Sequence, residues 1–306
     1  MALDPRASRA LVFRAAGINC DQEMARGFRM AGADVDLLHV RQVVRAVAAD
    51  PAALDRYGLI GLPGGFSYGD DVASGRVLAL LVRQRLYPAL RTAAQRGTAM
   101  LGICNGFQVL TQAGLLPGPA SPGPGPHEQR QGNGQWAMGN GAERDGIEWP
   151  QQPATPTIAL CDNARGRYAD RWVRLSVDAS SPCVWTRDLQ HDPTGTLMLP
   201  VGHGEGRFFA PPAVVQALKA NGQAPLTYLD NFNASAGAIA GVCDPTGRIF
   251  GLMPHPDRFL DWTRHPHWTR LKPERSDKSG MDRGGKGEPT PGLRLFINAV
   301  EAAVPV

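Results

Sequence analysis

The sequence has 306 residues, of which 43% are hydrophobic and 20% are charged, and this is ordinary for a globular protein with a sizeable core. Its formal net charge of +4 is small, and no segment interleaves clustered basic and aromatic residues, so nucleic-acid binding is not indicated. No membrane-spanning run or secretory signal is visible, and the five cysteines include no C-x-x-C pair. We therefore expect a cytoplasmic protein whose thiols stay reduced, and we expect it to have no metal centre.

The first 115 residues alternate between short apolar runs and stretches with helical spacing. This order of strands and helices predicts an α/β protein with a doubly wound, mostly parallel sheet and helices on both faces. Ligands bind such sheets at the carboxyl ends of the strands. Strands are predicted over 10–15, 35–40, 57–65 and 98–104, and helices over 19–32 (with Asn19 as N-cap), over 71–95 and from 105 onward.

The second half begins with a segment rich in proline and glycine, over 117–126, and the chain stays polar to about 155. Another charged segment, rich in glycine and proline, covers 264–291. We expect a single domain over 1–306 with loop insertions at about 118–155 and 264–291. The remaining pattern predicts strands over 157–161, 171–177, 197–209, 226–230 and 238–244, a hairpin turning at 244–247, and helices over 211–222 and 292–303.

Cys104 stands where the predicted strand 98–104 meets a helix, in "GICNGFQ" (102–108). Gly-x-Cys-x-Gly has the spacing of a nucleophile elbow, in which the missing side chains let a strained turn close. The helix N-terminus behind the sulfur favours a thiolate. A buried structural cysteine is the alternative. Cys20 also follows a strand and begins a helix, but it lacks the flanking glycines.

A cysteine nucleophile needs a histidine to take its proton and a third group to orient that histidine. Two candidates stand beside an acid: His255 with Asp257 in "GLMPHPDR" (251–258), and His203 with Glu205 in "PVGHGEGRF" (200–208). An extended His-Pro-Asp segment turns the side chains of His255 and Asp257 to the same side. Local chemistry favours His255 and leaves His203 open.

Four motifs together, "GICNGFQ", "LPGGFSYGDD", "PVGHGEGRF" and "GLMPHPDR", resemble the glutamine amidotransferase subunit of phosphoribosylformylglycinamidine synthase. That family belongs to the class I (triad-type) glutamine amidotransferases, which have a flavodoxin-like fold. The first and last motifs are typical of the whole class, whereas "GGFSYGD" and "HGEGRF" are more specific. The resemblance covers about two thirds of the chain, outside the two expected insertions.

The resemblance implies a role for each matching residue. Cys104 is the nucleophile, His255 the general base and acid, and Asp257 the orienting acid, although the family usually has Glu at this last position. The same motifs imply that the backbone N–H groups of Gly65 and Asn105 form the oxyanion hole. The residues that they imply contact the substrate are Gly64, Phe66, Gln108, His203 and Glu205.

The reaction implied is hydrolysis of glutamine to glutamate and ammonia. A larger synthetase subunit, with or without a further small subunit, takes the ammonia and uses ATP and Mg to convert formylglycinamide ribonucleotide to its amidine in purine biosynthesis. The chain has no Gly-x-x-x-x-Gly-Lys-Ser/Thr stretch, so we expect no cofactor on it. Two alternatives stay open: a related flavodoxin-like cysteine hydrolase, and a catalytically silent binding subunit.

Overall fold

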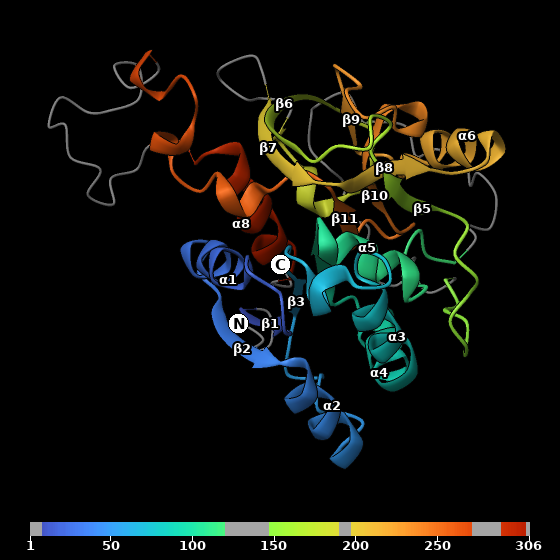
Figure 1. Ribbon diagram of the computed structural model, residues 1–306. Helices are drawn as coiled ribbons and strands as arrows, with labels where there is room; N and C mark the ends of the chain where they lie inside the picture. Colours follow the sequence, from blue (N-terminus) through green and yellow to red (C-terminus); the bar gives the residue numbers. More distant parts are fainter. Residues whose placement is uncertain (1–7, 120–146, 190–196, 271–288, 304–306) are drawn as a thin grey trace, which may run out of the picture.

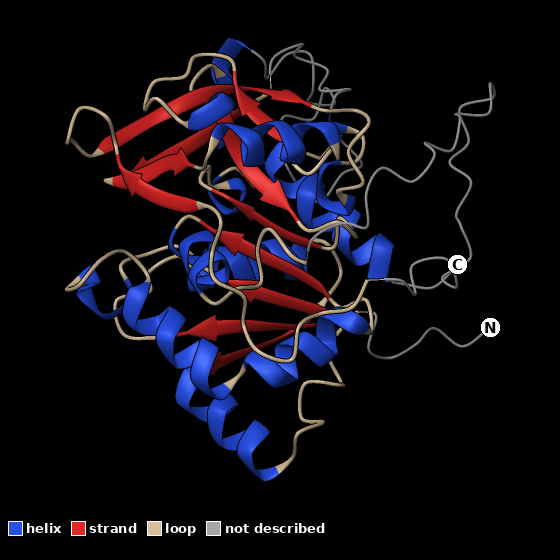
Figure 2. Cartoon of the chain, turned by 90° about the vertical axis from the view of Figure 1, so that its right-hand side faces the viewer, coloured by secondary structure: helices blue, strands red, loops and turns tan. Residues whose placement is uncertain are grey.

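The computed structural model describes residues 8–119, 147–189, 197–270 and 289–303, and a nine-stranded sheet runs through its centre (Figures 1 and 2). One half of the sheet is parallel, as in the predicted doubly wound arrangement. Its inner strands are short and almost wholly apolar because both faces of this half are covered, whereas the edge strand over 34–39 carries Asp34, Asp36 and His39 and is only partly buried. In spatial order they are β2 (Asp34–His39), β1 (Arg9–Arg14), β3 (Leu59–Leu62), β4 (Ala99–Ile103) and β11 (Ile249–Leu252).

The other half of the sheet is antiparallel and continues from β11 through the predicted hairpin. The hairpin turns where the Gly247 N–H donates to the Asp244 carbonyl at 2.9 Å. The predicted strand 197–209 is in fact two strands in different sheets, because the chain changes direction at Gly204. The antiparallel strands are β10 (Ile239–Cys243), β9 (Leu226–Tyr228), β6 (Ala169–Val177) and β7 (Met198–His203), and a separate pair is formed by β5 (Ala159–Asp162) and β8 (Glu205–Phe209).

Helices cover both faces of the parallel half (Figure 1). On one face α1 and α8 pack together, and the rings of Phe28 and Phe296 meet edge to face at 5.0 Å. On the other face α5 lies against the strands, with α3 and α4 outside it. The helices are α1 (Asp21–Met30), α2 (Val40–Ala49), α3 (Arg76–Arg85), α4 (Tyr87–Gln95), α5 (Asn105–Gln112), α6 (Pro212–Ala220) and α8 (Pro291–Ala303); short 3-10 turns are η1 (Ser67–Asp70), η3 (Val184–Thr186), η5 (Ala236–Ala238), η6 (Pro256–Arg258) and η7 (Trp262–Arg264).

Three helix predictions need correction. The single helix predicted over 71–95 is broken at Leu86, because Pro88 has no N–H to donate and its ring would clash with the preceding turn. Helix α2 was missed, although its valines have helical spacing and the His39 side chain caps it. Helix α1 has Cys20 as N-cap, not Asn19, and no side chain caps it.

The two predicted insertions lie partly outside the described residues, at 120–146 and 271–288. Their described ends pack on the body of the protein. Arg83 donates to the carbonyls of Pro153 and Ala154, and His265 is buried beside the ring of Phe259. None of the described helices has the length and apolar character needed to cross a membrane.

Candidate active site

Cys104 forms the sharp turn between β4 and α5. Its φ of 52° is costly for a residue with a side chain, on the order of 1–3 kcal/mol. The flanking glycines let the turn close: a Cβ on Gly102 would lie 2.6 Å from the Gly106 carbonyl oxygen, and one on Gly106 would lie 1.8 Å from that of Leu62. The predicted strand–turn–helix geometry is confirmed, and it holds the thiol at the carboxyl end of β4.

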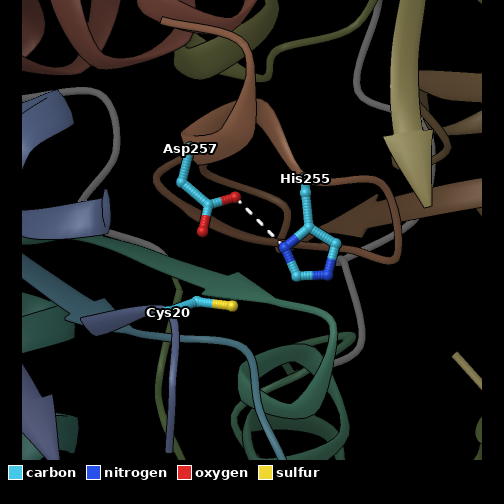
Figure 3. A group of neighbouring side chains, drawn as sticks. All are labelled: Cys20, His255 and Asp257. Carbon is cyan, nitrogen blue, oxygen red and sulfur yellow. Dashed lines mark hydrogen bonds and ion pairs between the residues drawn. The ribbon is translucent and has the colours of Figure 1, made fainter. Parts of the chain in front are cut away.

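His255 and Asp257 follow β11 directly and are almost fully buried, at 1% and 2% exposure. The His255 Nδ1 lies 3.2 Å from the Asp257 Oδ1, so the predicted contact is present (Figure 3). The segment is a 3-10 turn rather than the extended His-Pro-Asp that we expected. Asp257 thus engages Nδ1. The other ring nitrogen, Nε2, has no hydrogen-bond partner among the described residues and is therefore the one that can exchange a proton.

Gly64 is the point at which these segments meet. Strands β3, β4 and β11 are parallel neighbours, so their carboxyl ends lie at one edge of the sheet. A Cβ on Gly64 would lie 2.7 Å from the His255 Cε1 and 3.5 Å from the Cys104 Cβ. The imidazole and the predicted nucleophile therefore flank the same glycine, and a side chain at this position would push them apart.

Opposing effects set the charge of the buried imidazole. Burial lowers the pKa of His255, but the Asp257 carboxylate and the neighbouring thiols of Cys104 and Cys20 raise it well above its ordinary value. A proton on His255 is therefore stabilised beside a thiol. This arrangement can hold a thiolate–imidazolium pair, the reactive form of a cysteine nucleophile.

The family of CobB/CobQ-like glutamine amidotransferase domains matches residues 7–301. The chain belongs to this family. The phosphoribosylformylglycinamidine synthase subunit PurQ of Dehalococcoides mccartyi is 33% identical over 96% of this chain and 97% of its own length. The subunit of the same name from Methanococcus maripaludis is 34% identical over 96% of each chain. A solved structure of PurLQS from Thermotoga maritima matches with a TM-score of 0.61 and 26% identity, covering 96% of this chain and 97% of that one.

In this glutamine amidotransferase, the two residues predicted to form the oxyanion hole lie beside the site: Asn105 follows Cys104, and Gly65 follows Gly64. Gly65 has φ 139°, and a Cβ on it would lie 2.7 Å from the backbone nitrogen of Asn19. The Phe66 N–H beside it donates to Gly17 at 2.9 Å, which anchors the loop. The N–H groups of Gly65 and Asn105 donate no hydrogen bond to any described residue. They remain the predicted oxyanion hole.

The side chain of Asn105 links the loop after β3 to helix α5, which follows the predicted nucleophile, and the sequence did not reveal this role. Its Oδ1 accepts from the Ser67 N–H at 3.4 Å, and its Nδ2 donates to Asp70 at 3.2 Å and to Gln108 at 3.1 Å. Gln108 in turn donates to the Glu205 carbonyl at 2.5 Å. Both ends of the Gln108 amide are thus engaged, so a contact with substrate would have to replace one of these bonds.

His203 lies next to the site but is not a rival for the role of base. It is buried with its ring over Gly206 and near Phe232, and neither ring nitrogen has a hydrogen-bond partner among the residues described. Burial, and then the charge of His255, lower the pKa of His203 to about 4, so it is neutral near pH 7. Its neighbour Glu205 accepts from the Ser74 N–H at 3.2 Å and does not orient either histidine.

Cys20 is a second thiol in the site, and its position at the start of a helix was the only hint to it in the sequence. Its Sγ accepts from the Arg258 Nη2 at 3.1 Å and donates to the Asn19 side chain at 3.2 Å. Ligand atoms of Cys20, His255 and Asp257 lie within 4.8 Å of one another, a grouping that could suit a metal ion (Figure 3). The guanidinium on the sulfur disfavours a second cation there.

The raised pKa of His255 predicts a pH-dependent stability. The folded-state pKa lies above the unfolded value, so the contribution is fully present below about pH 6.5 and is lost as the pH rises through the folded-state pKa. Asp257→Asn removes the main attraction that raises this pKa. The difference in free energy of unfolding between wild type and this variant should therefore shrink as the pH rises above about 6.5. Urea denaturation at each pH measures it, and a difference that is constant or grows would contradict the charged pair.

Proposed function

We propose that this chain is the glutaminase subunit of phosphoribosylformylglycinamidine synthase. The observation that carries the proposal is the meeting of a thiol on a strained turn with a carboxylate-bound imidazole across Gly64. Relatives of that name match nearly the whole chain, which supports the choice of this enzyme among amidotransferases.

In the proposed reaction, the Cys104 thiol gives its proton to His255 Nε2, and the sulfur attacks the side-chain amide carbon of glutamine. The N–H groups of Gly65 and Asn105 stabilise the negative oxygen that forms. His255 then returns the proton to the departing nitrogen, which leaves as ammonia. Water, deprotonated by His255, hydrolyses the glutamyl thioester, and Asp257 holds the ring in one tautomer throughout.

We assign the substrate contacts to the residues that the resemblance implies: Gly64 and Phe66 from the loop after β3, Gln108 from α5, and His203 and Glu205 from β7 and β8. The low pKa of His203 keeps its ring neutral near pH 7, so it does not compete for the proton that His255 carries. Gln108 exchanges its bond to the Glu205 carbonyl for one to the substrate.

The ammonia passes to a synthetase subunit, which uses ATP and Mg to convert formylglycinamide ribonucleotide to formylglycinamidine ribonucleotide. The Thermotoga maritima neighbour, described as PurLQS, supports an assembly of this kind. The complex belongs in the cytoplasm, where reducing conditions preserve the thiol.

Glutamine turnover by the purified chain should be low and should rise when the synthetase, ATP and formylglycinamide ribonucleotide are added. The reason is the Gly64–Gly65 peptide, whose carbonyl is held by one long hydrogen bond, 3.3 Å from the Cys20 nitrogen. Flipping it removes one oxyanion donor, which costs roughly 3 kcal/mol, or about 10²–10³ in rate. A partner that holds the loop restores that rate. Glutamate release, measured with and without the partner, tests this.

Two glycine variants test whether the activation depends on the loop that contains Gly65. Gly65→Ala should lower the activated rate, because its Cβ meets the Asn19 backbone, whereas Gly166→Ala, with φ 58° but no neighbour within 4 Å, should not. Full turnover by the isolated chain, unchanged by the partner, would contradict the switch. No turnover and no amidine product under any condition would favour a silent binding subunit.

A further inference from the structure

Arg258 reaches from the turn after Asp257 to the rim of the site. Its Nη2 donates to the Cys20 Sγ, and its Nη1 lies 3.5 Å from the point where a Cβ on Gly202 would stand. The carbonyl oxygen of Gly202 is itself 3.7 Å from the Cys104 Sγ. The guanidinium therefore lies close to the nucleophile, on a residue that remains exposed to solvent.

Most of the hydrogen-bonding capacity of this guanidinium is unused. Arg258 makes no ion pair and no side-chain hydrogen bond besides that to Cys20 with the residues that the structure describes. Sulfur is a weak acceptor, whereas a guanidinium carries five N–H donors in a planar fork that matches a carboxylate. Arg258 is thus prepared to bind an anionic group that comes from outside the chain.

Tyr168 completes the rim. Its hydroxyl lies 3.0 Å from the same point above Gly202 that Arg258 approaches, so both polar groups border the space that a side chain would fill. The Tyr168 ring is 54% exposed and lies 6.4 Å from the ring of Phe66, which is 43% exposed and belongs to the oxyanion loop. A cation and a hydroxyl therefore border the space beside Gly202, whose carbonyl contacts Cys104, and two exposed aromatic residues lie next to them.

We propose that Arg258, assisted by Tyr168, binds the α-carboxylate of glutamine while the amide lies at Cys104. The inference rests on the proposed glutaminase function. Glutamine carries its carboxylate at the end opposite to the reacting amide, only a short carbon chain away. With the amide carbon at the Cys104 sulfur, the other end of the molecule reaches the rim around Gly202. A bidentate pair between guanidinium and carboxylate fixes the orientation as well as the affinity.

Cys20 is then a positioning residue. Its fully buried sulfur holds one edge of the Arg258 guanidinium, and its thiol is fixed by Asn19. This contact leaves Nη1 directed toward Gly202. It gives the second thiol a role that requires no reaction at its sulfur.

The test compares glutamine with 4-aminobutanamide, which has the same amide and amino group but no carboxylate. In the complex with synthetase, Arg258→Met should raise the KM for glutamine about 10–100-fold with kcat little changed, because it removes binding that is equal in ground and transition states. The kcat/KM for 4-aminobutanamide should stay as in wild type. The KM for glutamine of Arg258→Lys should lie between those of wild type and Arg258→Met, since lysine keeps the positive charge but not the planar fork of N–H donors. Arg29→Met, on the exposed side of α1, is the matched control.

Cys20 is tested by a double-mutant cycle. Cys20→Ala should raise the KM for glutamine several-fold. Cys20→Ser should keep most of the affinity, because its oxygen still accepts a hydrogen bond from Arg258. In the Arg258→Met background, Cys20→Ala should raise the KM little further. If glutamine and 4-aminobutanamide lose activity equally, Arg258 acts on the thiolate and the proposal is wrong. If neither changes and only synthetase binding weakens, Arg258 is a docking contact and the proposal is also wrong.

Alkylation of the thiol requires no glutamine turnover, so it tests the carboxylate site independently of the proposed glutaminase function. Alkylation of Cys104 by 6-diazo-5-oxonorleucine, which carries the carboxylate, should slow about 10–100-fold in Arg258→Met, whereas alkylation by iodoacetamide should not. If wild type shows no glutaminase activity, the proposed function fails. If the two reagents respond equally to the variant, the carboxylate site fails whatever the activity.

Discussion

Replacing Cys104 with alanine should abolish glutamine hydrolysis, with a loss of about 10⁴-fold or more in kcat, because the variant lacks the sulfur that forms the thioester and the other thiol nearby, Cys20, is fully buried and bound by Arg258. The fold should survive, since the strained turn loses only one sulfur atom. Glutamate release by the variant in complex with synthetase measures the loss. Synthesis from added ammonia should persist, because that step lies on the partner.

Labelling identifies the thiol directly. 6-Diazo-5-oxonorleucine should modify Cys104, which is 6% exposed, and leave Cys20, which is fully buried beneath Arg258. Cys161→Ala, in β5, should keep wild-type activity as the matched control. Peptide mapping that finds the label on Cys20 would overturn the assignment of the nucleophile.

Asp257→Asn should lower kcat by about 10²–10⁴-fold and change glutamine affinity far less. An amide at Nδ1 no longer selects the tautomer or stabilises the imidazolium. Steady-state kinetics at saturating glutamine measure the effect. Asp257→Glu should retain activity, because the longer side chain restores the residue usual in the family and still carries the charge.

Wild-type kcat in the Asn variant would mean that another group orients His255. Glu205, the other acid beside a histidine in the sequence, accepts a hydrogen bond from the Ser74 N–H and cannot replace Asp257 as the group that orients His255. A loss of affinity with kcat intact would instead indicate that Asp257 shapes the substrate site.

The parts of the site that could be predicted are those fixed by a few consecutive residues. The Cys104 turn needs glycines two positions away on either side, and the His255–Asp257 contact spans two residues, so both leave a local pattern. The parallel strands were predicted for the same reason, since each is a continuous apolar run. Helix α2 also leaves a local pattern, because its valines have helical spacing and His39 caps its start.

The contacts that could not be predicted join residues far apart in the sequence. Arg258 and Cys20 are separated by 238 positions, and the Asn105–Asp70 bond by 35. Neither pair has a spacing or a motif, because their meeting depends on how the strands are ordered in the sheet. Gln108 shows the same limit: its place in the site was predicted, but its bond to the Glu205 carbonyl was not.

The hydrogen bonds of Asn105 couple the loop after β3 to the start of α5, so that the two segments move as one unit. Ser67 and Asp70 belong to the loop, and Asn105 makes the contacts with both and carries one N–H of the predicted oxyanion hole. A partner that shifts this loop therefore acts on the nucleophile's helix directly. Thermodynamic linkage makes the effect reciprocal: if the synthetase tightens glutamine binding by some factor, bound glutamine tightens the synthetase by the same factor. Through this unit, the substrate of one subunit becomes an effector of the assembly.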